Sequence, residues 1–256
     1  MTHTVRAVAG AAYDRIGVNY ARYRRPDPRI EQALARALGA ARSVVNVGAG
    51  SGSYEPRERA VVAVEPSEVM VRQRPPGAAP VVRASAEQLP FADGSFDAAL
   101  AILTVHHWAD RRAGLREMLR VARERVVLLT WDPSYTGFWL VDDYFPELLA
   151  YDCKILPSLD ELASVLGPLE VTSVPIPHDC SDGFLGAYWR RPLAYLDDGA
   201  RSAISSFARI SGVDARLAKL RADVESGRWA QRNAALLGLS ELDLGYRIVV
   251  ASALQP

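Results

Sequence analysis

Cysteine, lysine and long apolar runs are scarce in this chain, and each shortage excludes a class of protein. The only cysteines are Cys153 and Cys180, so we expect two free thiols instead of the dense disulfide framework of a small secreted domain. The chain has no apolar run of the ~18 residues that a membrane helix needs. Its first residues also lack the apolar core of a signal peptide, so we expect a cytoplasmic protein without a membrane partner.

The charges of the chain balance, with 30 basic and 30 acidic side chains among 256 residues. A nucleic-acid footprint normally needs a basic excess or stripe, so we expect no nucleic-acid partner. The sequence has no C-x-x-C or H-x-x-x-H pair to anchor a metal, so we predict no metal site. Because 49% of the residues are hydrophobic, the chain can bury the core of one large domain, with or without an insertion.

Short apolar runs alternate with helical or loop segments through the first half of the chain. The runs are continuous, without polar alternation, which is typical of parallel strands covered on both faces. A helix at 29–41 precedes them. The predicted strands are 43–47, 60–64, 80–83, 96–103 and 125–130.

The second half of the chain predicts a capped helix at 158–167, a strand at 169–176 and a last strand at 244–250. A long helical stretch over 183–238 separates the two strands, and it is too long for a simple connection. We therefore predict a core over 1–180, a helical cap that carries the acceptor region over 181–240, and the last core strand over 241–256.

Three glycines at alternate positions, Gly48, Gly50 and Gly52, follow the first predicted strand, and Glu65 ends the second. Glycines allow a sharp turn and a close backbone approach to a ligand. An acidic side chain after such a turn is well placed to accept hydrogen bonds from ribose hydroxyls. The spacing is not the G-x-G-x-x-G of dinucleotide-binding proteins, and no Walker lysine follows. The pattern predicts a cofactor that contains a nucleoside.

Four ordered segments, 44–53, 62–70, 84–97 and 103–108, together resemble the class I S-adenosylmethionine-dependent methyltransferases. The resemblance is to the ubiquinone/menaquinone-biosynthesis-like (type 11) branch. It implies an α/β fold with a seven-stranded, mainly parallel Rossmann-like sheet and a helical cap inserted before the last strand. It also implies S-adenosylmethionine as cofactor, S-adenosylhomocysteine as product, and methyl transfer to a small-molecule acceptor such as a secondary metabolite.

The resemblance assigns the cofactor-binding roles residue by residue. The methionine part, the ribose, the adenine and the sulfonium are contacted, in that order along the chain, by Asn46, Gly48, Ala49, Gly50, Gly52, Glu65, Pro66, Ser67, Met70, Ser85, Ala86, Glu87, Thr104 and Val105. Tyr23 belongs to an aromatic and basic amino-terminal segment that resembles the family's cofactor-covering helix. The chain departs from the family at Asn46 and Ser85, where an aspartate is usual, so neutral groups meet the cofactor there.

Histidine is the natural general base when a methyl acceptor is protonated. His106 and His107 follow the fourth predicted strand, where cofactor and acceptor should meet, and His178 lies beside Asp179 at the start of the cap. We predict these three as candidate bases. The alternative is that His106 or His107 caps the next helix, and that 178–182 is a loop whose aspartates cap a helix.

Three other functions compete with the methyltransferase hypothesis. Glu65 would also suit the ribose of an NAD-dependent oxidoreductase, although the glycine spacing argues against it. The fold and cofactor could serve a non-methylating cyclase or a regulatory protein. An RNA methyltransferase would need a basic face, which the neutral composition disfavours. The sequence predicts no oligomeric state.

Overall fold

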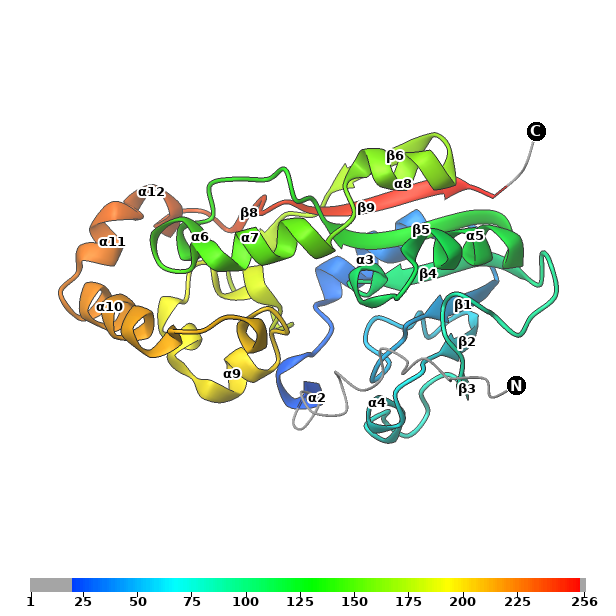
Figure 1. The fold of residues 1–256 in the computed structure, drawn as a ribbon, viewed down its shortest axis with the longest axis horizontal. Coiled ribbons are helices and arrows are strands. Elements are labelled where there is room, and N and C mark those ends of the chain that lie inside the picture. Colours follow the sequence, from blue (N-terminus) through cyan, green and yellow to red (C-terminus); the bar gives the residue numbers. More distant parts are fainter. Residues whose placement is uncertain (1–19, 254–256) are drawn as a thin grey trace, which may run out of the picture.

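The computed structural model describes residues 20–253, which form an α/β fold around one seven-stranded sheet (Figure 1). The strand order is β3-β2-β1-β4-β5-β9-β6. Strand β9 is antiparallel to both its neighbours, whereas β1 to β5 pair in parallel. The strands are β1 (Ser43–Val47), β2 (Ala60–Val64), β3 (Val81–Val82), β4 (Phe96–Ile102), β5 (Ala122–Trp131), β6 (Leu169–Ser173) and β9 (Tyr246–Ser252). The predicted fold class is confirmed.

The central strands are apolar throughout because both faces of the sheet are covered. Helix α3 (Pro28–Ala37) packs against β5 and β9, while α5 (Arg111–Val121) packs against β4, β5 and α8 (Leu159–Leu166). Successive residues Val44 and Val45 of β1 have no exposed surface, yet they belong to two different apolar clusters. This is the alternation of side chains across a strand, with a core on each face.

The helices that flank the sheet begin and end where the sequence supplies capping groups. Asp27 accepts a hydrogen bond from the Arg29 N–H at the start of α3, and Pro28 occupies the first turn. Ser158 caps α8 by accepting from the Glu161 N–H, and Gly167, at φ +79°, ends it. The predicted helix at 158–167 is therefore confirmed.

The predicted long helical stretch over 183–238 is wrong in its continuity, because the segment folds into several short helices. Pro192 begins one of them, and Gly212 and Gly227 adopt left-handed φ angles of +68° and +76° that interrupt the regular backbone. The pieces are η2 (Leu185–Tyr188), η3 (Pro192–Leu196), α9 (Asp198–Ser202), η4 (Phe207–Arg209), α10 (Val213–Glu225), α11 (Arg228–Arg232) and α12 (Ala234–Leu237), where η marks a 3₁₀ helix.

Three element boundaries also differ from the prediction, two of them in strands and one at the end of α3. The strand expected at 169–176 ends at Ser173, and a separate pair, β7 (Ile176–Pro177) and β8 (Glu241–Leu242), follows. The last strand begins at Tyr246 instead of residue 244, because Gly245 has φ +84° and turns the chain. The predicted 29–41 helix ends at Ala37.

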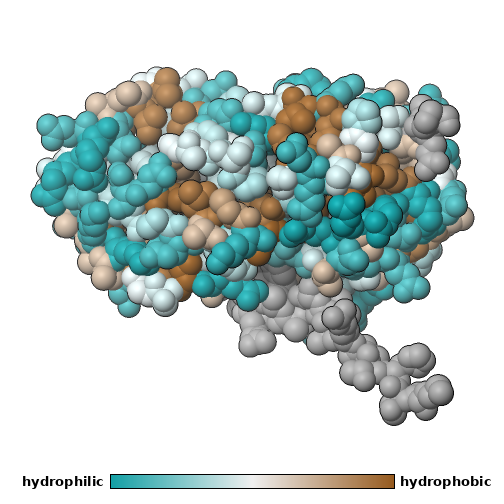
Figure 2. All heavy atoms as spheres, turned by 45° about the horizontal axis from the view of Figure 1, so that its top comes forward, coloured by the Kyte–Doolittle hydropathy of each residue, from teal (hydrophilic) through white to brown (hydrophobic). Residues whose placement is uncertain are grey.

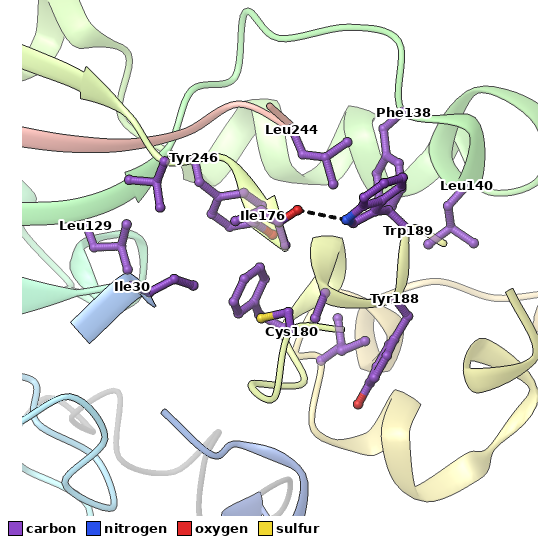
Figure 3. Close-up of a cluster of buried hydrophobic side chains, with 14 of the residues drawn as sticks. Ile30, Leu129, Phe138, Leu140, Ile176, Cys180, Tyr188, Trp189, Leu244 and Tyr246 are labelled. Atoms are coloured by element: carbon purple, nitrogen blue, oxygen red, sulfur yellow. Dashed lines mark hydrogen bonds between the residues drawn. The ribbon is translucent and has the colours of Figure 1, made fainter. Parts of the chain in front are cut away.

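The short helices lie at one end of the molecule, beyond the sheet (Figure 1), and aromatic side chains join the two parts. Trp139, in α6 (Trp139–Asp143), makes edge-to-face contacts with Tyr195 and Trp229 at centroid distances of 5.8 and 5.2 Å. In Figure 3, Trp189 donates its indole N–H to the Ile176 carbonyl, over 2.9 Å. Rings from the cap and from the segment after β5 thus share one apolar cluster.

Hydrophobic residues also reach the surface in places, in several groups between hydrophilic areas on the face shown in Figure 2. Leu193, at 58%, is the most exposed large hydrophobic residue among those described. Scattered surface hydrophobics of this kind are normal for a folded domain. Within residues 20–253, none of the helices combines the length and the apolarity that crossing a membrane demands.

The buried Trp189 gives a direct test of how the cap is held. Trp189→Ala removes a fully buried ring and its hydrogen bond to Ile176, so it should lower the free energy of unfolding by about 3–5 kcal/mol. Leu193→Ala, at an exposed site of the same cap, should change it by less than about 0.5 kcal/mol. Urea denaturation measures both, and equal losses in the two variants would contradict the packing.

Candidate functional site

A cavity of about 590 Å³ opens at the carboxyl ends of β1, β2 and β4. Here it is called the large cavity. The crevice beyond the carboxyl strand ends is where open α/β sheets bind ligands. Most residues that the sequence assigned to the cofactor line it. These are Asn46, Gly48, Ala49, Gly50, Glu65, Pro66, Ser67, Met70, Ser85, Ala86, Glu87 and Thr104.

The turn after β1 forms one wall of the large cavity, and its conformation requires glycine. Gly48 has φ +71° and donates its N–H to the Val64 carbonyl, over 2.9 Å. A Cβ on Gly48 would lie 2.3 Å from the hydroxyl oxygen of Thr104, too close for any side chain. The glycine therefore lets the turn sit directly against the end of β4.

Glu65 stands at the end of β2 with its carboxylate held in a fixed orientation. One oxygen accepts a hydrogen bond from the Gly50 N–H and the other from the Ser67 N–H, each at 2.8 Å. The residue is 7% exposed and lines the large cavity. Ser67 in turn caps α4 (Glu68–Arg72), so the glycine turn, the carboxylate and the helix form one hydrogen-bonded unit.

Asn46 brings an unsatisfied polar group to the same cavity. It is 1% exposed, and neither its amide nitrogen nor its amide oxygen has a hydrogen-bond partner among the described residues. The indole nitrogen of Trp108, another lining residue, is likewise buried without a partner there. Because buried polar groups are nearly always hydrogen-bonded, these atoms indicate a polar ligand.

Backbone strain is concentrated at the large cavity. Tyr54 and Leu103, at φ +61° and +49°, are the non-glycine residues with positive φ in the described part of the chain, and both line this cavity. A left-handed conformation costs such residues on the order of 1–3 kcal/mol, and it tends to be kept at functional sites. Leu103 lies immediately after β4, where the turn toward His107 begins.

A second cavity, of about 80 Å³, adjoins the first and is here called the small cavity. Arg24, Leu103 and His107 line both cavities, whereas His106 lines the small one alone. The two imidazoles belong to η1 (Val105–His107), and their ring centroids are 3.9 Å apart. The His107 imidazole therefore stands at the junction of the two cavities.

Both histidines are half-buried and held neutral. Burial lowers the pKa of His107 to about 4, with smaller effects from the positive charges of Arg209 and Arg24. Burial, followed by the neighbouring His107, lowers the pKa of His106 well below its ordinary value. The neutral imidazole of His107 has a lone pair that can accept a proton, and its pKa of about 4 makes it a weak base at pH 7.

Buried polar side chains link the cavity walls to the start of the cap. The Asp182 carboxylate has no exposed surface and accepts hydrogen bonds from the Arg24 guanidinium, at 2.6 Å, and from the Tyr54 hydroxyl, at 3.0 Å. Burial raises the pKa of Tyr54 far above its ordinary range, so its hydroxyl stays a donor. These bonds fix Arg24 beside both cavities.

Several predicted site residues lie outside the large cavity. Tyr23 packs over Gly199 of α9, and Gly52 approaches Arg74 instead of the cavity. Val105, the first residue of η1, is buried in the core. His178 is partly exposed and lines neither cavity; its Nδ1 lies 3.1 Å from the Ser240 carbonyl.

The predicted covering segment before Tyr20, together with His3, lies outside the described residues. Other lining residues were not predicted from the sequence. They are Arg24, Ser51, Ser53, Tyr54, Ile102, Leu103, Trp108, Ala109 and Asp110. Five of the nine are direct neighbours of predicted residues, and extending each motif by two residues would have found all but Asp110. Hydrogen bonds to the Asp182 carboxylate hold Arg24 and Tyr54 at the cavity.

Within residues 20–253, no three histidine, cysteine, aspartate or glutamate side chains are grouped so that they could hold a metal ion.

The depressed pKa of His107 makes the stability of the fold depend on pH. The folded state binds a proton at His107 only near pH 4, whereas an unfolded histidine binds it near pH 6.5. Stability is therefore lost as the pH falls from 6.5 toward 4. Between pH 7 and pH 4.5, the free energy of unfolding should fall by about 1–2 kcal/mol more in the wild type than in His107→Gln. Urea denaturation at the two pH values measures this difference. Equal losses would contradict a buried, neutral imidazole.

Comparisons with known proteins agree with this site. Residues 45–130, which supply most of the large cavity, match the model of a methyltransferase domain. A curated relative, the demethylmenaquinone methyltransferase of Mycolicibacterium vanbaalenii, is 39% identical over 93 residues. That match spans 36% of this chain and 38% of the relative's length.

Similarity to solved structures extends over nearly the whole chain. A protein of Anabaena variabilis described as a methyltransferase from an antibiotic biosynthesis pathway is 35% identical, with a TM-score of 0.83. The match covers 90% of this chain and 99% of that one. The geranyl diphosphate C-methyltransferase of Streptomyces coelicolor, solved with S-adenosyl-L-homocysteine, shares the fold at 15% identity and a TM-score of 0.50, over 88% of this chain and 75% of that one. The chain belongs to the class I S-adenosylmethionine-dependent methyltransferases, in their type 11 branch.

Proposed function

We propose that this protein transfers the methyl group of S-adenosylmethionine to a small-molecule acceptor bound in the small cavity, with His107 as the base. The observation that carries the proposal is the position of His107, which lines the large and small cavities at their junction. A reaction between two bound molecules depends above all on holding them in adjoining sites.

The large cavity fits the cofactor. Glu65 presents an oriented carboxylate suited to the ribose hydroxyls, and the glycine turn leaves backbone room for the methionine part. The unpartnered amide of Asn46 can accept from an ammonium or donate to a carboxylate, although it lacks the charge of the family's usual aspartate. Met70, which lines the cavity beside Gly50, supplies an adaptable apolar contact for the adenine.

The remaining chemistry falls to the residues at the junction. S-adenosylmethionine, when bound, supplies an electrophilic methyl group. His107 is neutral at pH 7 and can take the proton that an N–H or O–H acceptor releases. Leu103 and the other apolar residues that line the small cavity surround that point. His106 can serve the same role from within the small cavity, while His178 lies outside both cavities and has no part in this proposal.

Because the chain belongs to a family that uses S-adenosylmethionine as its cofactor, the NAD-dependent alternative is set aside.

The domain boundaries remain a proposal: a core over 1–180 and 241–256, with 181–240 as the cap. A segment of the cap supplies Phe184, Leu185, Ile204 and Ser206 to the small cavity. This supports an acceptor region there.

Binding of S-adenosylhomocysteine, measured by isothermal titration calorimetry, tests the cofactor site. Glu65→Gln should weaken it about tenfold or more, because hydrogen bonds to a charged group contribute about 1.5–3 kcal/mol. Glu170→Ala, an exposed carboxylate of β6, should leave the affinity unchanged. Absence of binding to the wild type at high micromolar concentration would overturn the proposal. Unchanged affinity in Glu65→Gln would overturn the ribose placement.

A further inference from the structure

The small cavity contains a carboxylate, that of Asp152, which the proposed function does not use. Asp152 lies in α7 (Pro146–Ile155), is 6% exposed, and lines the cavity together with the histidine pair. Its one hydrogen bond to a side chain comes from Ser206, whose hydroxyl donates to Oδ1 over 2.9 Å. Within residues 20–253, no ion pair joins Asp152 to a basic side chain.

Burial of a carboxylate in such a place is unfavourable unless a donor or a cation meets it. The second oxygen, Oδ2, has no hydrogen bond from the described residues, yet it is not among their fully buried unsatisfied atoms. It therefore keeps some accessible surface, in a residue that lines the small cavity. Burial raises the pKa of Asp152 to about 6, against a smaller, opposing effect of the hydrogen bond from Ser206.

The other charged and titratable groups that line the small cavity do not neutralise this carboxylate. The Arg24 guanidinium is paired with Asp182, at 2.6 Å. Burial keeps His106 and His107 neutral at pH 7 and raises the pKa of Tyr246 well above its ordinary value, so its hydroxyl is also neutral there. Asp152 thus gives the cavity a negative site.

The rest of the wall is suited to an organic cation. Trp131, Phe184 and Tyr246 contribute aromatic rings, and Leu156 and Ile204 contribute aliphatic groups. Aromatic faces attract ammonium groups, most strongly where water is excluded. A buried carboxylate surrounded by aromatic and aliphatic side chains selects a ligand that has both an ammonium group and an apolar body.

We propose that Asp152 is the specificity-determining residue of the acceptor site: the acceptor is a small apolar molecule whose ammonium group pairs with this carboxylate as an anchor, while a separate N–H or O–H group of the same molecule gives up its proton and receives the methyl group. The proposal rests on the proposed function only in calling this ligand the methyl acceptor. The pairing of an amine with Asp152 stands on the small cavity alone, so it can be tested separately.

The test uses three probes that share a four-carbon chain and differ in the charge of the head group: butylamine, butan-1-ol and butyrate. Each is titrated into the full-length protein at pH 7.5, with and without saturating S-adenosylhomocysteine, and binding is followed by NMR. Butylamine should bind at least tenfold more tightly than butan-1-ol, and butyrate should not bind measurably. Equal affinity for butylamine and butan-1-ol, or tighter binding of butyrate, would overturn the proposal.

Variants assign the preference to Asp152. Asp152→Asn should weaken the binding of butylamine at least tenfold and change the affinity for butan-1-ol by no more than about twofold. Asp160→Asn, at an exposed position of α8, should change neither affinity. Ser206→Ala keeps the carboxylate and should retain the preference for butylamine. An unchanged butylamine affinity in Asp152→Asn, or a loss of the preference in Ser206→Ala, would contradict the assignment.

S-adenosylhomocysteine affinity separates this proposal from the proposed function. Asp152 and Ser206 lie outside the large cavity, so both variants should bind S-adenosylhomocysteine as the wild type does, which also shows that they fold. A wild type that fails to bind it overturns the methyltransferase proposal. The preference for butylamine, measured without it, still decides the role of Asp152.

Discussion

The buried carboxylate of Asp182 holds together three segments that are far apart in the sequence. It accepts from Arg24, which precedes the first helix of the core, and from Tyr54, which follows the glycine turn, while its own backbone begins the cap. Removal of such a carboxylate would leave a buried guanidinium and a buried phenol without their acceptor. The large and small cavities keep their common wall because this one interaction fixes Arg24 between them.

The same region also contains the least favourable features of the fold. Leu103 and Tyr54 adopt left-handed backbone conformations, and the Asn46 amide is buried without partners among the described residues. Asp152 is a buried carboxylate satisfied by one hydroxyl. The well-packed surroundings, including the two apolar clusters on the faces of the sheet, stabilise these groups in place. Strained and unsatisfied groups that gather at two adjoining cavities are what a preorganised binding site requires.

Much of the fold and of the candidate cofactor site could be predicted from the sequence, because both depend on local patterns. The strand at 60–64 and the capped helix ending at Gly167 were predicted at their boundaries, since apolar runs, caps and glycines act over a few residues. The prediction failed over 183–238. There the helical propensity of many residues is overridden by glycine and proline and by packing on the aromatic cluster.

The sequence by itself determined the glycine turn of the candidate cofactor site, because Gly48, Gly50 and Glu65 follow two consecutive strands that pair side by side in the sheet. Only the tertiary structure decided which histidine faces both cavities and that His178 faces neither. The small cavity likewise depends on Asp152, Ser206 and Tyr246, which are distant in sequence. Their burial, charge state and mutual contact arise only when the cap packs against the sheet.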